Sequence, residues 1–344
     1  MANPRMIDVA RRARVAPSTV SYALSGQRTI SPSTRQRVLQ AIAELGYKPN
    51  ELARSLASRR SRIVALLLPA SQRGIGFTEM EFATGAAQAA RELDHQLVLS
   101  VTNQNTADQV AELNEGGLIA GAILMEVRLN DERIALLRDA GIPFSMIGRP
   151  QDPDGIDCAD IDFDQTARDA VKHLVELGHR RIAFLNHSAS DVSASYGPSV
   201  RAAAGFRRAA AEFSVGYLER PCGEDTESGE AAFHELIAAD PELTGIAIMN
   251  DRATAGVLSA IEQIGANVPR DFSVVSIASS TRVTEMFRPR LTTLEPQAIE
   301  LGRMGARLLI AALQAPPGVE REPTLALLPC RLVIGGSSGP APVN

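Results

Sequence analysis

The sequence predicts two parts of different fold class: a small all-α head with a helix-turn-helix, and an α/β body of two doubly wound parallel-sheet lobes. Charge separates the two parts. Residues 1–62 hold twelve basic and three acidic side chains, whereas the other 282 residues hold 23 basic and 37 acidic ones. Periodicity also separates them, because a helical period up to residue 45 gives way to alternating strand and helix patterns after residue 62.

Three helices are expected in the head, over residues 6–13, 17–24 and 32–45. Pro17 and Pro32 fit the first turns of the second and third helices, where a missing backbone N–H costs no hydrogen bond. Two short helices joined by a tight turn form a helix-turn-helix, whose second helix enters the major groove of DNA. The net charge of +9 in residues 1–62 suits binding to the phosphate backbone.

An ordered set of motifs spans the first fifty residues. It comprises Met6-Ile-Asp-Val-Ala, Val15-x-x-x-Thr19-Val20-Ser21, Thr34-Arg35 and Glu44-Leu45-Gly46-Tyr47-x-Pro49-Asn50. This set resembles the head of the lactose-repressor (LacI/GalR) family of transcriptional regulators. Two departures stand out: Arg14 occupies a turn position where the family usually has Gly, and Ala16 occupies one where it usually has a capping Ser or Thr.

The resemblance implies which side chains of the head contact DNA. Base edges are assigned to Pro17, Ser18 and Tyr22, and a phenol at position 22 cannot form the bidentate pair with guanine that an arginine forms. Phosphate contacts, which fix the register without reading sequence, are assigned to four further residues. These are Thr19, Ser21, Thr34 and Arg35, of which Thr19 alternatively makes a buried contact between helices.

A hinge is expected over residues 49–61, after a head of residues 1–48. Residues 50–58 read as a helix of barely two turns, which is marginal alone in water. The segment resembles the hinge helix of the family, which implies that Leu56 is wedged into the minor groove and that Ala53 allows close approach of the backbone. The alternative is that Leu52 and Leu56 only pack the hinges of two subunits together.

The body, residues 62–338, alternates strands with helices in two successive units. Strands are expected at 63–68, 97–102, 121–125, 143–147, 181–185, 245–249 and 273–277, and helices at 79–93, 107–115, 131–140, 164–177, 199–213, 229–239, 253–264 and 298–313. Such alternation predicts two doubly wound lobes.

Several motifs of the body also match the family. They are Leu177-Gly-His-Arg-Arg-Ile-Ala, Asn250-Asp251, Val268-Pro-Arg-Asp-Phe-Ser-Val-Val and Leu291-Thr-Thr. The resemblance implies lobes of the periplasmic-binding-protein type, the first at about 62–161 and 293–322 and the second at about 162–292 and 323–338. In this arrangement a last strand near 324–333 returns to the second lobe, and residues 339–344 are a flexible tail.

Ligands of such folds lie at the carboxyl ends of the strands. Six positions are candidates for binding a small effector there: Ser71, Phe77, Arg149, Arg201, Asn250 and Asp251. The resemblance makes Arg201 the anchor for ligand hydroxyls, although it could instead pair with a carboxylate of the cleft. Asp251 could equally cap the next helix, and Phe77 could merely pack on the lobe surface. Ala278 stands where many sugar-binding members carry an aspartate, which leaves room for a disaccharide, a glycoside or a ligand that is not a sugar.

Other functional classes find little support. No apolar run is long enough to span a membrane and no secretory signal opens the chain, so we expect a cytoplasmic protein. Cys158, Cys222 and Cys330 are too far apart for a zinc site, and neither a metal nor a cofactor is expected. The motif Gly335-Gly-Ser337-Ser-Gly339 imitates a nucleophile elbow, but no histidine follows it, so it reads as part of the tail rather than as a catalytic site.

We therefore expect a sequence-specific repressor, not an enzyme. A homodimer would bind a near-palindromic DNA operator and respond to a small, sugar-like effector held between the lobes. Two rival classes are a solute-binding protein, which should have a signal peptide and no basic head, and a sugar-metabolising enzyme with a fused DNA-binding head.

Overall fold

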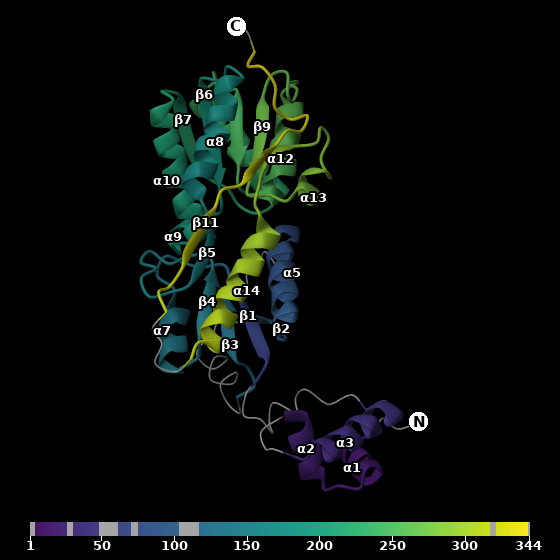
Figure 1. Cartoon of the computed structure of the whole chain (residues 1–344). Helices are drawn as coiled ribbons and strands as arrows, with labels where there is room; N and C mark the ends of the chain where they lie inside the picture. The colour runs from purple at the N-terminus through teal and green to yellow at the C-terminus, as the bar shows by residue number, and fades with distance from the viewer. Residues whose placement is uncertain are drawn as a thin grey trace. The chain divides into compact units, whose positions relative to one another are not determined.

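The computed structural model describes residues 4–25, 30–47, 61–69, 75–102, 117–316 and 321–342. The head contains the three expected helices, α1 (Met6–Ala13), α2 (Pro17–Ser25) and α3 (Pro32–Leu45), in a helix-turn-helix arrangement (Figure 1). Val9, Val20 and Val38, one from each helix, are fully buried together and form the centre of its small core. Ser31 caps α3 by accepting the backbone N–H of Thr34, and Gly46 ends it in the left-handed region.

The first lobe of the body contains a six-stranded sheet with the strand order β11-β5-β4-β3-β1-β2. The strands β1, β3, β4, β5 and β11 pair in parallel. The bounds are β1 (Ile63–Pro69), β2 (Gln96–Thr102), β3 (Gly121–Leu124), β4 (Phe144–Ile147), β5 (Cys158–Ile161) and β11 (Leu325–Leu328), with helices α5 (Phe77–Glu92), α7 (Glu132–Asp139) and α14 (Ala298–Gln314). The central strand β1 is buried over five successive residues, as expected for a strand covered on both faces.

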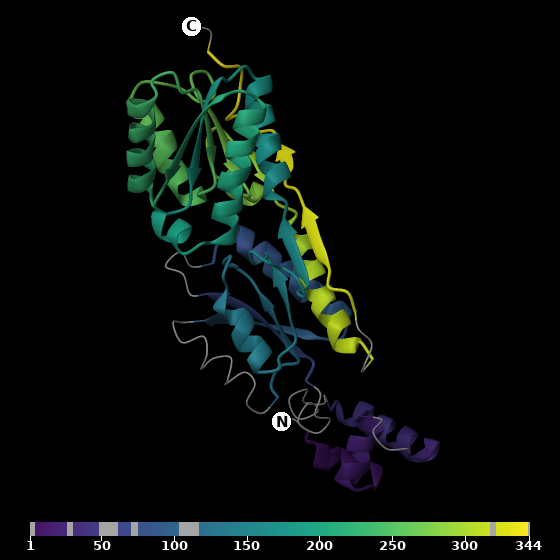
Figure 2. The ribbon, with the colours of Figure 1, turned by 90° about the vertical axis from the view of Figure 1, so that its left-hand side faces the viewer.

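The second lobe contains a sheet of order β12-β10-β9-β8-β6-β7, parallel except for the antiparallel edge strand β12. The strands are β6 (Arg181–Asn186), β7 (Gly216–Pro221), β8 (Gly245–Ile248), β9 (Ser273–Ile277), β10 (Thr292–Glu295) and β12 (Arg331–Val333). The helices are α8 (Phe163–Glu176), α9 (Ala189–Ser193), α10 (Gly197–Glu212), α11 (Thr226–Ala239), α12 (Asp251–Gln263) and α13 (Thr281–Thr284). The pairs α8·α10 and α11·α12 lie on opposite faces of this sheet (Figure 2). No helix in the described part of the chain is both long and apolar enough to cross a membrane.

Within the described residues, the chain passes between the two lobes three times, each time through one or two residues. The passages are at Asp162, at 296–297 and at 329–330. Asp162 donates its backbone N–H to the carbonyl of Leu328, and the Gln297 side chain donates to the carbonyl of Pro329 at 3.1 Å. The three passages therefore lie side by side and are joined by hydrogen bonds.

Two predictions about the C-terminal part were wrong. The single strand expected near 324–333 is two strands in different sheets, because β11 pairs with β5 of the first lobe and only β12 joins the second. Strand β10 likewise belongs to the second lobe, so the return to the first lobe follows Glu295 instead of preceding residue 293.

The prediction that residues 339–344 form a flexible tail also needs correction, because the described part of this segment packs on the second lobe. Ser337 is fully buried; its hydroxyl donates to the Val274 carbonyl and accepts the backbone N–H of Thr292. Beyond it, the carbonyl of Gly339 hydrogen-bonds with buried His179, and the N–H of Ala341 donates to Leu177. Small residues allow this segment to lie flat on the second lobe. Its Gly, Ser and Pro content therefore reflects close packing and not conformational flexibility.

Glycines bring two helix pairs into unusually close contact, one pair in each lobe. In the first lobe a Cβ on Gly85 of α5 would overlap the carbonyl of Ile299, and one on Gly302 of α14 would overlap the carbonyl of Phe82. In the second lobe Gly229 of α11 and Gly256 of α12 face each other's helices in the same way. The helices α5 and α14 pack side by side along much of their length (Figure 1), so these glycines set the position of α5.

We predict that Gly85→Ala lowers the free energy of unfolding by about 1–3 kcal/mol, because the added methyl group forces the two helices apart. Helix propensity alone would give the opposite sign, a gain of about 1 kcal/mol. Urea denaturation followed by circular dichroism measures the difference. Gln88→Ala on the exposed face of α5 is the control and should be nearly neutral. A Gly85→Ala variant as stable as the wild type would contradict this account of the packing.

Candidate DNA interface and ligand pocket

Helix α2 presents its first turns to solvent. Pro17 and Ser18 are exposed, while Thr19, Ser21 and Tyr22 are partly buried. Val20 on the opposite side of the helix is fully buried in the head core. The packing thus directs the N-terminal, polar side of α2 outward, which is the side that a recognition helix presents to base edges.

The start of α3 contributes Thr34 and Arg35. The Thr34 hydroxyl lies 2.8 Å from that of Ser31 and belongs to the cap of the helix, whereas Arg35 is exposed. Backbone N–H groups at a helix start and a nearby guanidinium both favour an anion. The arrangement is chemically suited to a phosphate contact.

The turn between α1 and α2 is tight because Arg14 adopts the left-handed conformation, with φ 54° and ψ 51°. The backbone N–H of Val15 then donates to the carbonyl of Ala10 and closes the end of α1. A side chain in this conformation costs about 1 kcal/mol relative to glycine. Glycine would suit this position because it adopts the left-handed conformation without strain. Arg14 is strained here but places a positive charge beside the turn.

The acidic residues described in the head face arginines of the head itself. Asp8 lies 3.8 Å from Arg11, and Glu44 of α3 forms an ion pair with Arg12 of α1. Arg35 has no carboxylate partner among the described residues. The head therefore retains an excess of positive charge after its own ion pairs are formed.

Three residues expected to contact ligands lie outside the described residues. They are Ala53 and Leu56 of the hinge and Ser71 after β1. Their assignments stay predictions.

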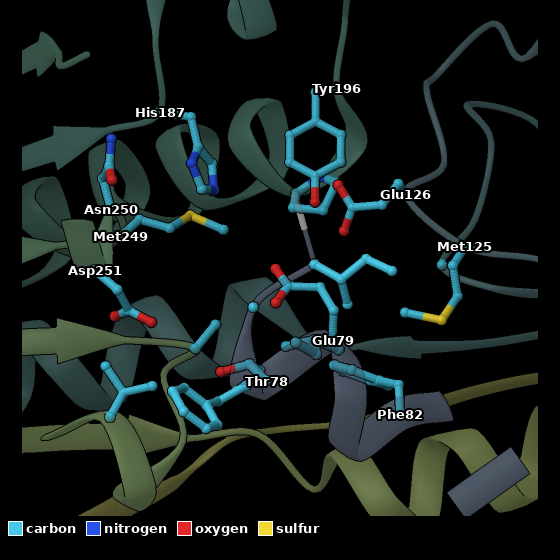
Figure 3. A pocket seen from close by; sticks show the side chains of 18 of the residues that line it. Thr78, Glu79, Phe82, Met125, Glu126, His187, Tyr196, Met249, Asn250 and Asp251 are labelled. Atoms are coloured by element: carbon cyan, nitrogen blue, oxygen red, sulfur yellow. The ribbon is translucent and has the colours of Figure 1, made fainter. Parts of the chain in front are cut away.

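A pocket of about 560 Å³ opens in the body, where the carboxyl ends of strands from the two lobes face each other. The first lobe contributes the start of α5 and the segment after β3; the second contributes the segments after β6 and β8 (Figure 3). This volume is within the range of sites for small ligands. Among its side chains are Thr78, Glu79, Phe82, Glu126, His187, Tyr196 and Met249.

Three of the sequence-predicted effector residues line this pocket: Phe77, Asn250 and Asp251. Asn250 is also the N-cap of α12, its side chain accepting the N–H of Ala253 and donating to the carbonyls of Cys222 and Gly223. The cap of α12 is thus Asn250, and the alternative that gave this role to Asp251 was wrong. Asp251 begins the helix and accepts the Ser276 hydroxyl at 3.3 Å.

Arg149 and Arg201 line a second cavity of about 310 Å³ and are not among the residues of the larger pocket. Arg201 donates to the carbonyl of Pro150 at 2.7 Å, while the Arg149 Nε lies 3.3 Å from the buried Asp160 Oδ2 without hydrogen-bond alignment. Asp160 itself lines the larger pocket. Of the two arginines only Arg149 lies within ion-pair distance of Asp160 among the described residues, so both assignments of Arg201, to a ligand or to a carboxylate, stay predictions.

Two buried carboxyl groups of the pocket have raised pKa values. Burial raises the pKa of Asp160 to about 6, against the opposing charges of Arg201 and Arg149. Burial also raises the pKa of Asp251 to about 6, and here the neighbouring charge of Glu79 acts in the same direction. Loss of hydration penalises both carboxylates; two arginines oppose it at Asp160, and the hydroxyls of Ser279 and Ser276 and the charge of Arg252 oppose it at Asp251.

Sequence reasoning missed several residues that line the pocket, chiefly Glu126, Asp160, His187 and Tyr196. Glu126 and His187 follow β3 and β6 by one or two residues, so the strand-end rule could have found them. Asp160 lies within β5, a four-residue strand that the sequence pattern did not indicate. Tyr196 precedes α10 in a loop without a distinctive motif.

A helix-turn-helix joined to a two-lobed body with a ligand-sized pocket defines a DNA-binding regulator of the ligand-responsive class. Comparison with known proteins agrees. Residues 5–50 match the model of bacterial regulatory proteins of the lacI family, and residues 171–338 match a periplasmic-binding-protein-like domain.

The chain is 31% identical to the HTH-type transcriptional regulator CelR of Thermobifida fusca over 96% of its length and 97% of that protein. It is 30% identical to catabolite control protein A of Priestia megaterium, covering 89% and 92% of the two chains. The solved structure of a transcriptional regulator CelR–cellobiose complex aligns with 97% of the chain and 100% of its own, with a TM-score of 0.71 and 28% identity. The chain belongs to the lacI family of bacterial regulatory proteins and is a DNA-binding transcription regulator.

We predict that Asp251→Asn stabilises the body at pH 7.5 by on the order of 1–3 kcal/mol. The native state holds the Asp251 proton up to a raised pKa of about 6, so the ionised group weakens folding above that pH. The gain should shrink as the pH falls from 6 towards 4 and vanish below the ordinary aspartate pKa of 3.8, where native and unfolded states are both protonated at this position. Denaturation curves across this range measure it, with Glu262→Gln on the exposed side of α12 as the control. A gain that does not depend on pH would argue against ionisation as its cause.

Proposed function

We propose that the chain is a repressor that binds a near-palindromic operator as a homodimer and is controlled by a small effector in the body pocket. The observation that carries this proposal is the pocket itself, whose walls come from both lobes next to three short interlobe passages. A ligand that contacts both walls has different affinities for different lobe angles, and it can shift their balance only by that difference.

The proposed chemistry of the effector is that of a polar, sugar-like molecule. Carboxylates, an imidazole and aromatic rings line the pocket together, a combination that can hydrogen-bond hydroxyls and cover an apolar ring face. The CelR structure was solved as a complex with cellobiose, which supports a sugar or glycoside here as well. Phe77, Asn250 and Asp251 are proposed to face the effector, while Arg149 and Arg201 are proposed to hold Asp160 in position. We propose no catalytic role for any of these groups.

The proposed dimer has a candidate contact in the first lobe. Edge strand β2 exposes three aliphatic side chains, Val98, Leu99 and Val101, each more than 40% exposed. An apolar sheet edge of this kind is a liability in a monomer and is normally covered. We propose that a second copy of the chain covers it, and sedimentation of the full-length protein tests the oligomeric state.

The DNA assignments predict two different effects on binding. Tyr22→Phe should cost about 1 kcal/mol at the specific site and relax sequence preference, because it removes one hydroxyl that reads bases. Arg35→Gln should weaken binding to all duplexes alike and reduce the salt slope by about one. Fluorescence anisotropy with operator and random duplexes over a salt series distinguishes them. Arg91→Gln on the exposed surface of α5 removes the same charge from the body and is the control. If Tyr22→Phe weakened binding to all duplexes alike, or if Arg35→Gln weakened binding only to the operator, the assignments would be contradicted.

The hinge assignments predict that Leu56→Ala lowers operator affinity by tenfold or more, because the minor-groove wedge is lost. Ala53→Leu should also weaken binding, since a larger side chain prevents close approach of the backbone. Gel shifts on operator DNA measure both effects. If Leu56→Ala bound the operator as tightly as the wild type, the wedge would be excluded and simple packing of the two hinges would remain.

A further inference from the structure

The large pocket is strongly acidic. Its described lining includes the carboxylates of Glu79, Glu126, Asp160, Glu224 and Asp251, but only one guanidinium, that of Arg252, and one imidazole. Asp160 has Arg149 beside it, and Glu126 and Glu224 make further contacts of their own, so Glu79 and Asp251 are the two carboxylates of interest.

These carboxylates come from both walls. Glu79 belongs to the first turn of α5, and Glu126 follows β3 in the same lobe; Asp251 begins α12 in the other lobe. Figure 3 shows the three carboxylate groups directed into the same space. Asp251 accepts the Ser276 hydroxyl and lies in the field of Arg252, but in the part of the chain that the structure describes no cation lies within ion-pair distance of Asp251 or Glu79.

Among the described residues, other carboxylates near the pocket have an arginine beside them, unlike Glu79. Glu81, two residues after Glu79 on α5, accepts the Ser280 hydroxyl at 2.9 Å and lies 3.5 Å from Arg282. Asp160, 5% exposed in the same lining, has Arg149 within 3.3 Å, yet no hydrogen bond reaches its Oδ2. Within the described residues, the pocket thus combines two carboxylates outside any ion pair, Glu79 and Asp251, with a buried Asp160 oxygen that lacks a hydrogen-bond donor.

A neutral sugar could donate hydroxyl hydrogens to these oxygens, but it would leave the excess negative charge in place. Charge in a water-poor cavity is costly unless an opposite charge accompanies it. The raised pKa of Asp251, which burial causes and Glu79 reinforces, reflects this cost. A protonated amine would remove it and supply several donors at once.

The remaining walls favour a cation as well. Phe77, Phe82 and Tyr196 line the same cavity, and aromatic faces attract cations as well as covering the apolar face of a sugar ring. Figure 3 shows Phe82 and Tyr196 on opposite sides of the Glu79 carboxylate.

We propose that the effector carries a protonated amine on a polyhydroxylated frame, the chemistry of an amino sugar, and that Glu79 and Asp251 bind this amine between the lobes. The inference rests on the proposed function and names the ligand class of the same pocket. The like charges of Glu79 and Asp251 on the two walls repel each other. A cation between them attracts both walls, so it stabilises the lobe angle at which the two carboxylates are nearest.

Matched pairs of sugars test this proposal with the full-length protein. The pairs are glucosamine with N-acetylglucosamine, galactosamine with N-acetylgalactosamine, and the chitosan disaccharide with chitobiose, in each of which acetylation removes the positive charge. We expect isothermal titration calorimetry to give at least tenfold tighter binding of the amine in one pair or more. Added salt should reduce this preference, because it screens the attraction.

Isosteric variants locate the effect. Glu79→Gln and Asp251→Asn should each reduce the preference for the amine over its acetylated partner about tenfold, because an amide keeps the shape of the carboxylate without its charge. Glu262→Gln, which removes an exposed carboxylate from α12, should bind like the wild type. Thermal denaturation of each variant confirms folding, so a lost preference cannot be attributed to an unfolded body.

Two results would overturn the inference. One is a panel in which no amine binds more tightly than its acetylated partner; the other is an amine preference that survives both variants. If a neutral sugar then released the operator, the proposed function would stand without this ligand class. Failure of the proposed function has a different signature, because an amine would bind with the expected preference yet leave operator affinity unchanged.

Discussion

The three passages between the lobes are the constraint on which the rest of the body depends. Each is one or two residues long, and hydrogen bonds from Asp162 and Gln297 join them into one narrow region. Because all covalent links between the lobes lie together, a change in lobe angle must pivot there. The pocket lies between the same two lobes, so its width follows directly from that angle. A small ligand can then act through geometry, without any rearrangement inside either sheet.

Polar contacts away from the passages oppose free movement of the lobes. On one side Ser280 of the second lobe donates its N–H and hydroxyl to Thr78 and Glu81 of α5. On another the N–H of Leu129 donates to Ser195 at 2.8 Å. A few such bonds are each worth about 1 kcal/mol, which is comparable to the difference in affinity that a ligand can supply. The close packing of α5 against α14 transmits any movement of the Glu79 wall to the first lobe as a rigid unit.

Much of this fold could be predicted from sequence, since long amphipathic helices and continuous apolar strands carry strong periodic signals. Short or charged strands carry weak ones. Strand β5 has four residues, and β7, Gly216–Pro221, is a partly exposed edge strand containing a glutamate and an arginine. The pocket was harder still, because Glu79 and Asp251 are far apart in sequence and meet only through the lobe arrangement. The C-terminal segment beginning at Gly335 was wrongly predicted to be flexible, because Gly, Ser and Pro also permit flat packing over a buried surface.

The pKa values of Asp160 and Asp251 are raised to a similar extent, but the charges around the two carboxyl groups differ. Burial raises the pKa of each to about 6. Asp160 faces Arg149 and Arg201, so two guanidinium charges of the chain itself oppose the cost of its burial. Asp251 faces Glu79, and the hydroxyls of Ser276 and Ser279 and the charge of Arg252 offset only part of the cost of its burial. A carboxylate that stays costly where the two walls meet is best explained by a ligand that completes its contacts, since otherwise an amide of the same shape would fold at lower cost.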